Sequence, residues 1–336
     1  MWNGPSSYPS HMESMKAAVI RHAGGPQVLK IEERPIPVPH NGEVLIRVKA
    51  FGLNRSELFT RQGLSPDVKF PRVLGIEAAG LVAAAPGKEF REGDIVATAM
   101  GGMGREYDGG YAEFTCVPSS QVQALKTTLP WETLGAIPEM LQTSWGSLFK
   151  SLRLEEGERL LIRGGTTSVG LAAAAIARTH GAYVAATTRR AEREPLLRAA
   201  GVQQVFIDNG VIAGQVKEVF PRGVDKVLEL VGTTTLEDSL RCAKQRGIVC
   251  MTGMVGNKWS LDDFSPMEVI PTAVSLTTYG GDAEDFMLTP LQELVEQIAA
   301  GRLPIQIGKV FRLEQIADAH RCMEENQAGG KIVVLT

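Results

Sequence analysis

The stretch LLIRGGTTSVGLAAAAIA (160–177) constrains the fold more than any other part of this chain. An apolar run ends in two glycines, a short polar turn follows, and small apolar residues continue behind it. A strand that passes through a glycine loop directly into a helix opens the βαβ unit that binds dinucleotides. Short glycine loops also serve as plain turns, so the motif alone leaves both interpretations open.

The sequence around this stretch favours the dinucleotide interpretation. Strand-like and helix-like segments alternate from about residue 159 onward, and this alternation predicts a parallel, doubly wound α/β sheet of the Rossmann type. The segment AVSLTTYG (273–280) is rich in β-branched residues, as an edge strand often is. The expected strands are 159–164, 182–188, 203–208, 223–232, 246–253 and 273–281.

The first part of the chain has a different pattern. From Met15 to about Pro130, short strand-like segments such as EVLIRVKAFGL (43–53) and GDIVATAM (93–100) are separated by Pro and Gly. Many short strands of this kind predict a compact, barrel-like β domain. Residues before about Met15 are polar and turn-rich and lack the apolar core of a signal peptide. They contain SHM (10–12), shortly before the first strand-like segment begins. We expect them to be an appended tail outside the fold.

Composition excludes several classes of protein. The net charge of −3 is small and no run of Lys or Arg occurs, so no nucleic-acid surface is expected. No apolar run approaches the ~20 residues of a membrane span, so no membrane segment is expected either. Four scattered cysteines form neither a disulfide framework nor a metal cluster, which fits a reducing, cytoplasmic setting.

The glycine loop departs from the G-x-G-x-x-G fingerprint at one position. Gly165 and Gly170 match, and Thr167 replaces the middle glycine. The N–H groups and the positive dipole end of the following helix would face a pyrophosphate, and the hydroxyls of Thr166, Thr167 and Ser168 would add donors. A Walker loop is excluded because no Lys follows Gly170. The candidate loop contacts are Gly165, Thr166, Thr167, Ser168, Val169 and Gly170.

The end of the second strand predicts which dinucleotide binds. NAD sites usually place Asp or Glu here, where the carboxylate accepts from the ribose 2′-hydroxyl. This chain instead has Thr187, Thr188, Arg189 and Arg190. Two cations with two hydroxyls suit a 2′-phosphate, so NADPH is the expected cofactor. The alternative is that both arginines belong to the solvated start of a helix, where cations are electrostatically unfavourable.

Six segments, taken together and in order, resemble the medium-chain dehydrogenase/reductase superfamily, and within it the zinc-independent quinone oxidoreductases related to zeta-crystallin. They are AFGLNRSELFTRQG, PRVLGIEAAGLV, GDIVATAM, GGYAEF, GGTTSVGLAAAAIA and GKIVV. The resemblance implies a GroES-like catalytic domain (15–139 and 283–336) and a Rossmann NADP(H)-binding domain (140–282), with the cofactor in the cleft. It also implies a homodimer that pairs through the edge of the Rossmann sheet, where AVSLTTYG is the candidate strand.

Departures from the superfamily pattern predict an enzyme without metal. Its zinc alcohol dehydrogenases carry Cys and His in the stretches matching GLNRSE and LGIE, where this chain has Asn54 and Ile76. Neither an amide nor an alkyl group is a usual Zn²⁺ ligand, and Glu77 alone cannot hold a catalytic zinc. Without a Lewis acid to polarise an alcohol, we expect direct hydride transfer from NADPH to an acceptor that is already electrophilic.

The resemblance also implies roles for individual residues. Asn54 would point its amide at the substrate oxygen or the nicotinamide, unless it bonds loop backbone instead. Thr143 would lie near the nicotinamide, unless it caps or packs a helix. Quinone reductases of this type often have tyrosines after the Asn, where this chain has Phe59 and Ser65. The remaining candidate cofactor contacts are Val231, Gly253 and Lys331.

The expected function is therefore that of an NADPH-dependent quinone oxidoreductase-like enzyme, acting on a small electrophilic acceptor. One alternative is an NADPH-dependent reductase of α,β-unsaturated aldehydes, ketones or enoyl thioesters. Two others are a cofactor-binding structural or regulatory protein without turnover, and a zinc alcohol dehydrogenase. The sequence specifies no contacts that identify the acceptor.

Overall fold

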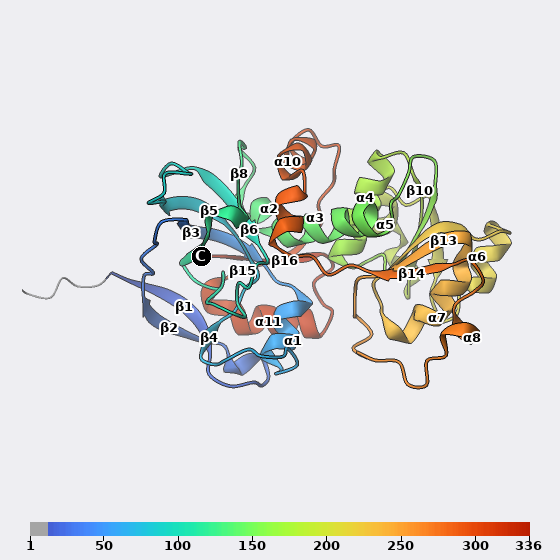
Figure 1. The fold of residues 1–336 in the computed structure, drawn as a ribbon, viewed down its shortest axis with the longest axis horizontal. Coiled ribbons are helices and arrows are strands. Elements are labelled where there is room, and N and C mark those ends of the chain that lie inside the picture. Colours follow the sequence, from blue (N-terminus) through green and yellow to red (C-terminus); the bar gives the residue numbers. More distant parts are fainter. Residues whose placement is uncertain (1–12) are drawn as a thin grey trace, which may run out of the picture.

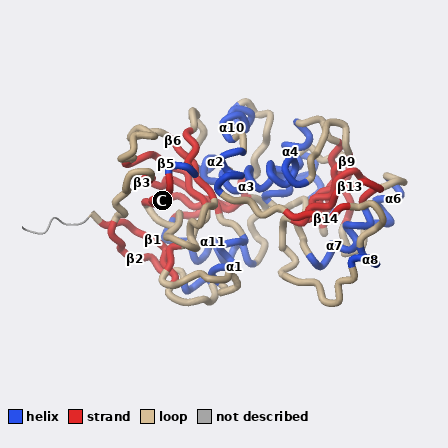
Figure 2. The backbone as a smooth tube through the Cα atoms, viewed as in Figure 1, coloured by secondary structure: helices blue, strands red, loops and turns tan. Residues whose placement is uncertain are grey.

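The structure of the protein, a computed structural model, describes residues 13–336. The tail expected before Met15 lies almost entirely outside the described residues. Two bodies lie side by side, one built mainly of strands and one in which strands and helices alternate (Figure 1). Figure 2 shows the same division, with helices on both sides of the strands in the second body.

The second body is built on a six-stranded parallel sheet with the order β11-β10-β9-β12-β13-β14. This is the strand order of a dinucleotide-binding fold, so the predicted doubly wound sheet is confirmed. Leu160, Leu161 and Ile162 of the central strand are fully buried, because helices cover both faces. The strands are β9 (Arg159–Arg163), β10 (Tyr183–Thr188), β11 (Gln204–Ile207), β12 (Val224–Glu229), β13 (Ala243–Met251) and β14 (Ser275–Thr278).

Helices connect these strands in the positions that the sequence predicts. α4 (Ser168–Thr179) follows the glycine loop, and its small apolar residues are buried against the sheet. β14 ends the sheet, as expected for AVSLTTYG, while the pairing of two chains there stays a prediction. The other helices of this body are α5 (Glu194–Ala199), α6 (Ala213–Val219), α7 (Thr233–Cys242) and α8 (Pro266–Val269).

The first body contains a seven-stranded sheet and a smaller sheet of three strands. β16 (Lys331–Leu335) runs antiparallel to β3 (Glu43–Gly52), so the C-terminal residues complete a sheet that starts near the N-terminus. The small sheet has β1 (Ser14–Ile20), β2 (Lys30–Pro35) and β4 (Arg72–Val73). The large sheet adds β5 (Glu77–Ala84), β6 (Ile95–Ala99), β7 (Phe114–Pro118), β8 (Val122–Ala124) and β15 (Ile307–Arg312).

α3 (Pro138–Trp145) joins the two bodies. It packs against α4, and one buried apolar cluster runs from Ala50 and Ala79 of the first body through Met140 to Ile162 of the second. The predicted domain boundary between residues 139 and 140 therefore falls within a single helix. The remaining helices are α1 (Arg55–Arg61), α2 (Trp131–Ala136), α9 (Ala283–Leu288), α10 (Leu291–Ala299) and α11 (Ile316–Glu324).

Two further expectations concern membranes and cysteines. Within residues 13–336, no helix combines the length and the apolar character needed to cross a bilayer. All four cysteines are free. Cys242, Cys250 and Cys322 are buried, whereas Cys116 is partly exposed.

Candidate active site

The glycine loop lies between the end of β9 and the start of α4. Gly164 has a φ of +84°, a conformation that favours glycine. Its N–H donates to the Thr187 hydroxyl at 3.0 Å, which ties the loop to β10. A Cβ on Gly170 would lie 2.7 Å from the Gly165 carbonyl oxygen, so glycine is needed for α4 to start this close to the loop. The two matched glycines are buried and act by shaping the loop.

Thr167, in the place of the middle glycine, is used differently from what we expected. Its hydroxyl donates to the Gly164 carbonyl at 2.9 Å and accepts the Gly170 N–H at 3.0 Å, so it caps α4. The hydroxyl proton is donated within the loop and does not point outward toward a phosphate. Thr166, Ser168 and Val169 are partly exposed around the helix start, where first-turn N–H groups lack intrahelical partners.

At the tip of β10 the two arginine side chains are exposed, whereas the two threonine hydroxyls bond neighbouring groups of the protein. The buried Thr187 accepts from Gly164, and the buried Thr188 hydroxyl bonds the backbone N–H and carbonyl of Arg190 at 3.2 and 3.1 Å. Both arginine side chains are exposed, and Arg190 precedes a short 3₁₀ turn. The hydroxyls therefore organise the tip, and Arg189 and Arg190 are the groups available to a phosphate.

The ends of β12 and β13 form the other side of the loop. A Cβ on Gly164 would lie 3.4 Å from Cγ2 of Val231, and Gly253 packs so closely on the Leu230 carbonyl that a Cβ would overlap it. Val231 and Gly253 are both partly exposed. The structure thus brings the predicted loop residues, Val231 and Gly253 to one edge of the sheet, at the carboxyl ends of parallel strands where cofactors bind.

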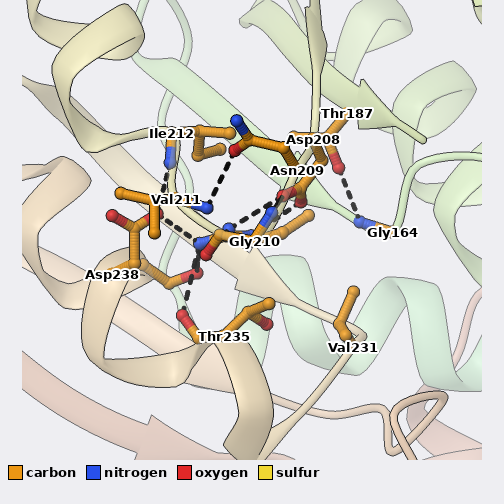
Figure 3. A network of polar contacts seen from close by, with 12 residues as sticks. Gly164, Thr187, Asp208, Asn209, Gly210, Val211, Ile212, Val231, Thr235 and Asp238 are labelled. Carbon is orange, nitrogen blue, oxygen red and sulfur yellow. Dashed lines mark hydrogen bonds and ion pairs between the residues drawn. The ribbon is translucent and has the colours of Figure 1, made fainter.

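A buried ion-pair network beside this edge was not found by sequence reasoning (Figure 3). Arg163, the last residue of β9, donates to both oxygens of Asp208 at 2.8 and 3.0 Å and to Asp238 at 2.7 Å. It also donates to the Gly210 carbonyl at 2.9 Å. Burial would raise the pKa of Asp208, but the hydrogen bonds and charge of Arg163 hold it below its usual value. A cation closing an apolar strand before two glycines was the available signal.

Glu229, at the end of β12, was also missed. One carboxylate oxygen accepts the N–H groups of Val231 and Gly232 at 2.7 and 2.9 Å. The other accepts the hydroxyls of Thr235, at 3.0 Å, and Ser239. Burial raises the pKa of Glu229 although these donors favour the carboxylate. Glu229 therefore holds the turn that carries Val231 to the edge of the cleft.

Asn54 lies at the start of α1 and is almost fully buried. Its Nδ2 donates to Oε1 of Glu77 at 2.9 Å, and its Oδ1 accepts from Nζ of Lys331 at 2.5 Å. Its backbone N–H donates to Glu57 at 3.1 Å, one turn into the helix. The amide is thus oriented by side chains from β5 and β16.

Lys331 is the cation of this cluster. Its Nζ lies 3.0 Å from Oε1 of Glu77 and 3.6 Å from Oε2 of Glu139, and only 1% of its side chain is exposed. We expected Lys331 to contact the cofactor, but here its ammonium is committed to Asn54 and the two carboxyl groups. Although burial alone would lower the pKa of Lys331, the charges of Glu77 and Glu139 raise it above its usual value.

The carboxyl groups of the cluster are strongly affected by burial. Burial raises the pKa of Glu57 to about 7, against the backbone N–H of Ile76 that it accepts at 3.1 Å. Burial also raises the pKa of Glu77, while the charge of Lys331 opposes the shift. The pKa of Glu57 therefore lies well above the usual range of an exposed carboxyl group.

Thr143 and its neighbour Ser144 place α3 between this cluster and the start of α4. Its hydroxyl donates to Oε1 of Glu139, one turn earlier in α3, at 2.7 Å. The next residue, Ser144, donates to the Val169 carbonyl at 3.2 Å, so α3 contacts the start of α4 directly. Asn54, Thr143 and Lys331, all predicted, are thus parts of one hydrogen-bonded group. Glu139, which connects them, was not singled out from the sequence.

A groove of about 360 Å³ opens between α1 and the loop that follows β13. The rings of Phe59 and Trp259 meet edge to face across it, with centroids 4.9 Å apart. Phe59 stands where related quinone reductases often have a tyrosine, so the groove has an aromatic wall without a phenol. Its other lining residues are Arg55, Leu58, Gln62, Leu64, Asn257 and Glu324.

The residues at the zinc-ligand positions of the superfamily do not fit a metal. The Asn54 amide is held by Glu77 and Lys331, and Ile76 offers a buried alkyl side chain. Among residues 13–336, no three His, Cys, Asp or Glu side chains converge in the manner of a metal site. Zinc independence nevertheless stays a prediction about the protein in solution.

A GroES-like sheet domain joined to a dinucleotide-binding fold, with a polar cluster next to the glycine loop, defines a class of two-domain oxidoreductases. Two family models match the chain: the alcohol dehydrogenase GroES-like domain over residues 40–127 and the zinc-binding dehydrogenase over residues 200–334. The quinone oxidoreductase of Pongo abelii is 29% identical over 332 residues, which cover 96% of this chain and 98% of that protein.

Solved structures agree with these matches. The crystal structure of AibC superimposes with a TM-score of 0.87 at 27% identity, covering 97% of this chain and 96% of AibC. A mycobacterial protein in complex with NADPH gives a TM-score of 0.85 at 28% identity, covering 96% of this chain and all of that one. The two domain models, the full-length quinone oxidoreductase relatives and these solved structures together support the predicted resemblance to the medium-chain dehydrogenase/reductase superfamily and, within it, to the quinone oxidoreductases related to zeta-crystallin. It is an oxidoreductase, as predicted.

Proposed function

We propose that this protein is an NADPH-dependent reductase that transfers a hydride directly, without zinc, to a quinone or a similar electrophilic acceptor. The observation that carries the proposal is the placement of α3. This helix bonds the start of α4 through Ser144 and the Asn54–Lys331 cluster through Glu139. A cofactor held by the loop would therefore lie beside a buried polar cluster suited to a reacting oxygen.

The residues at the sheet edge fit NADPH. The open start of α4, with Thr166, Ser168 and Val169, would hold the pyrophosphate, and Arg189 and Arg190 would hold the 2′-phosphate. Val231 and Gly253 would line the path toward the nicotinamide. When bound, NADPH supplies the hydride, and the protein binds and orients the two reactants. The solved NADPH complex of a mycobacterial relative supports this assignment.

The metal-free part of the proposal rests on the chemistry of the residues at the ligand positions. An amide at Asn54 and an alkyl group at Ile76 cannot replace a thiolate and an imidazole as zinc ligands. The Lys331 ammonium supplies the positive charge beside Asn54 and Glu77. An acceptor in this site must therefore be electrophilic without help from a Lewis acid, as quinones and activated alkenes are.

The groove next to α1 supports a planar, conjugated acceptor. Its volume of about 360 Å³ is within the usual range for small-molecule sites, ~300–1,000 Å³. Phe59 and Trp259 offer ring faces and edges on which an aromatic or quinonoid ring packs favourably. The names of the quinone oxidoreductase relatives favour a quinone over other conjugated carbonyl compounds.

An acceptor panel tests the proposal. Purified protein would be mixed with NADPH or NADH and with a benzoquinone, a naphthoquinone, an α,β-unsaturated ketone, an α,β-unsaturated aldehyde or an enoyl thioester. Cofactor oxidation would be followed by absorbance, and zinc by elemental analysis. We expect quinone reduction with NADPH, no stoichiometric zinc, and no inhibition by a chelator.

Each of the other outcomes would identify a different function for this protein. Reduction of the enones or enoyl thioesters, but not of the quinones, would establish the second reductase function. NADPH binding by fluorescence quenching without reduction of any acceptor would indicate a cofactor-binding protein without turnover. Stoichiometric zinc together with activity lost to a chelator would restore the zinc dehydrogenase alternative.

A further inference from the structure

The groove beside α1 adjoins both parts of the proposed active site. One of its walls is α1, which begins directly after Asn54 of the polar cluster. The opposite wall is the loop that carries Trp259, and this loop begins just after Gly253 at the edge of the parallel sheet. The groove is therefore placed to hold the part of an acceptor that extends beyond its reacting atoms.

The two charged residues that line the groove are not paired with each other, and only one of them has a counter-charge. Glu324, at the end of α11, pairs with the fully buried Arg61 and accepts from Nε2 of Gln62 at 3.2 Å. Within residues 13–336 the Arg55 side chain makes one hydrogen bond, from Nη2 to Oδ1 of the neutral Asn326 amide at 2.5 Å. The groove thus has an uncompensated positive charge.

Arg55 is also partly shielded from water. Its side chain is only partly exposed, and burial lowers its pKa without a neighbouring carboxylate to oppose the shift. The guanidinium nevertheless keeps its proton, because arginine is charged throughout the range in which proteins fold. A cation in such a place attracts an anion more strongly than a fully solvated cation does, because the effective dielectric constant is lower.

The shape and charge of the lining indicate which anion fits. Asn326 occupies one N–H of the guanidinium, and the remaining donors form the planar fork that matches the two oxygens of a carboxylate. A carboxylate carries one negative charge, which a single arginine balances, whereas a phosphate monoester carries about −1.5 to −2 at neutral pH. Phe59 and Trp259 provide the aromatic wall for a planar ring.

We propose that Arg55 selects acceptors that carry a carboxylate on a planar, conjugated ring system. The ring packs against Phe59 and Trp259, and the carboxylate binds the guanidinium. This inference rests on the proposed function and names its substrate class, acid-substituted quinones and related conjugated carbonyl compounds. Arg55 determines specificity through binding and takes no part in hydride transfer, and the carboxylate leaves the site unchanged.

The kinetic test compares a naphthoquinone carboxylate with its carboxamide, which has the same rings and a similar size but no charge. The two compounds differ in intrinsic reactivity, so the informative quantity is the change in their kcat/KM ratio on mutation. Arg55→Gln should lower the ratio of carboxylate to carboxamide about ten- to hundredfold, mainly through KM, since a charge-assisted contact corresponds to a factor of that size. Arg55→Lys keeps the charge without the fork and should give an intermediate ratio.

A matched control and two further measurements separate this role from a structural one. Arg302→Gln replaces an exposed arginine in the turn after α10 and should leave the ratio unchanged. The NADPH Kd and the melting temperature of Arg55→Gln should be those of the wild type. Added salt should reduce the preference for the carboxylate in the wild type but have little effect in Arg55→Gln.

A binding measurement needs no turnover. Isothermal calorimetry would compare 2-naphthoate, its neutral amide 2-naphthamide, and 2-naphthyl phosphate. We expect the wild type to bind 2-naphthoate most tightly, and Arg55→Gln to bind it no better than the amide. Trp259→Ala should weaken the binding of 2-naphthoate and 2-naphthamide alike, because both rings would lose the same wall of the groove.

The results that would overturn this inference differ from those that would overturn the proposed function. An unchanged ratio in folded Arg55→Gln protein contradicts the role of Arg55 and leaves the reductase intact. If Arg55→Gln does not fold, the ratio in Arg55→Lys decides in the same way. Tighter binding of 2-naphthyl phosphate than of 2-naphthoate overturns the assignment to a carboxylate. Wild-type protein that reduces no acceptor contradicts the proposed function, and calorimetry then still decides whether Arg55 binds an aromatic carboxylate.

Discussion

Replacing Arg163 by Met should destabilise the dinucleotide-binding body far more than the loss of a surface arginine. The guanidinium is fully buried and bonds both oxygens of Asp208, one oxygen of Asp238 and the Gly210 carbonyl. Met fills a similar apolar length but leaves two buried carboxylates without their cation. Breaking a buried ion pair from one side costs ~3–5 kcal/mol.

That free energy converts into a measurable melting shift. A unit of ~150–250 residues loses ~2–4 °C in melting temperature per kcal/mol, so the variant should melt ~6–20 °C lower. Arg163→Lys keeps the charge but loses the two-pronged contact with Asp208, so its melting temperature should fall between those of Arg163→Met and the wild type. Because Gly164 follows directly, NADPH affinity should also weaken in Arg163→Met.

The deficit should depend on pH with a definite sign. In the wild type the pKa of Asp208 is below its usual value, so its contribution to stability is present above the unfolded pKa and is lost as pH falls through the folded pKa. In Arg163→Met, burial still raises the pKa of Asp208, but the guanidinium that lowered it is gone. Asp208 then destabilises the folded state at neutral pH, and the deficit shrinks as acid protonates it.

Melting curves by circular dichroism, from neutral to mildly acidic pH, check both the size and the sign. Arg222→Met, on an exposed turn, is the matched control and should melt as the wild type does. If Arg163→Met and this control had the same melting temperature at neutral pH, the reasoning would be refuted. A deficit that grows as pH falls would refute the assignment of the effect to Asp208.

Three further predictions concern the site itself. Asn54→Ala should lower kcat more than NADPH affinity, because it removes the amide that Glu77 and Lys331 orient for the reacting oxygen; stopped-flow turnover and cofactor titration check this, and unchanged turnover in folded protein contradicts it. The double change Arg189→Ala, Arg190→Ala should weaken NADPH binding on the order of tenfold at low salt and NADH binding little. The reason is that one charge-assisted contact is worth ~1.5–3 kcal/mol before screening. Equal loss of affinity for both cofactors would show that the arginines support the fold. Trp259→Ala should raise KM for a naphthoquinone and leave the NADPH Kd unchanged, and an unchanged KM would place the acceptor outside the groove.

Local patterns predicted the fold well because its elements are short-range and repetitive. The alternation of strands and helices and the helix after the glycine loop follow from apolar runs that a short window of the sequence shows. The side-chain direction at Thr167 does not, since a threonine at a helix start can point outward or cap the helix. The hydroxyls at the tip of β10 bond backbone groups that the sequence did not indicate, and a contact of Thr188 with the cofactor stays a prediction.

The partners of the predicted site residues were harder to foresee. Asn54 stood out, but the contact with Lys331 joins residues 277 positions apart, and no local pattern encodes such a pairing. Glu139 looks like an ordinary acidic residue in the first turn of a helix until α3 is placed between the two bodies. The groove needed two aromatic residues from different bodies, Phe59 and Trp259, to meet.

The position of Lys331 on the last strand makes the order of synthesis matter. A nascent chain that has reached residue 300 already contains the whole cofactor loop and the acid groups of the cluster, but it has neither the ammonium that neutralises them nor the strand that pairs with β3. Incomplete or C-terminally clipped chains therefore hold the acidic half of the site without its counter-charge. The final segment of the chain is therefore the last part of the site to be synthesised, and the site is complete only when β16 pairs with β3.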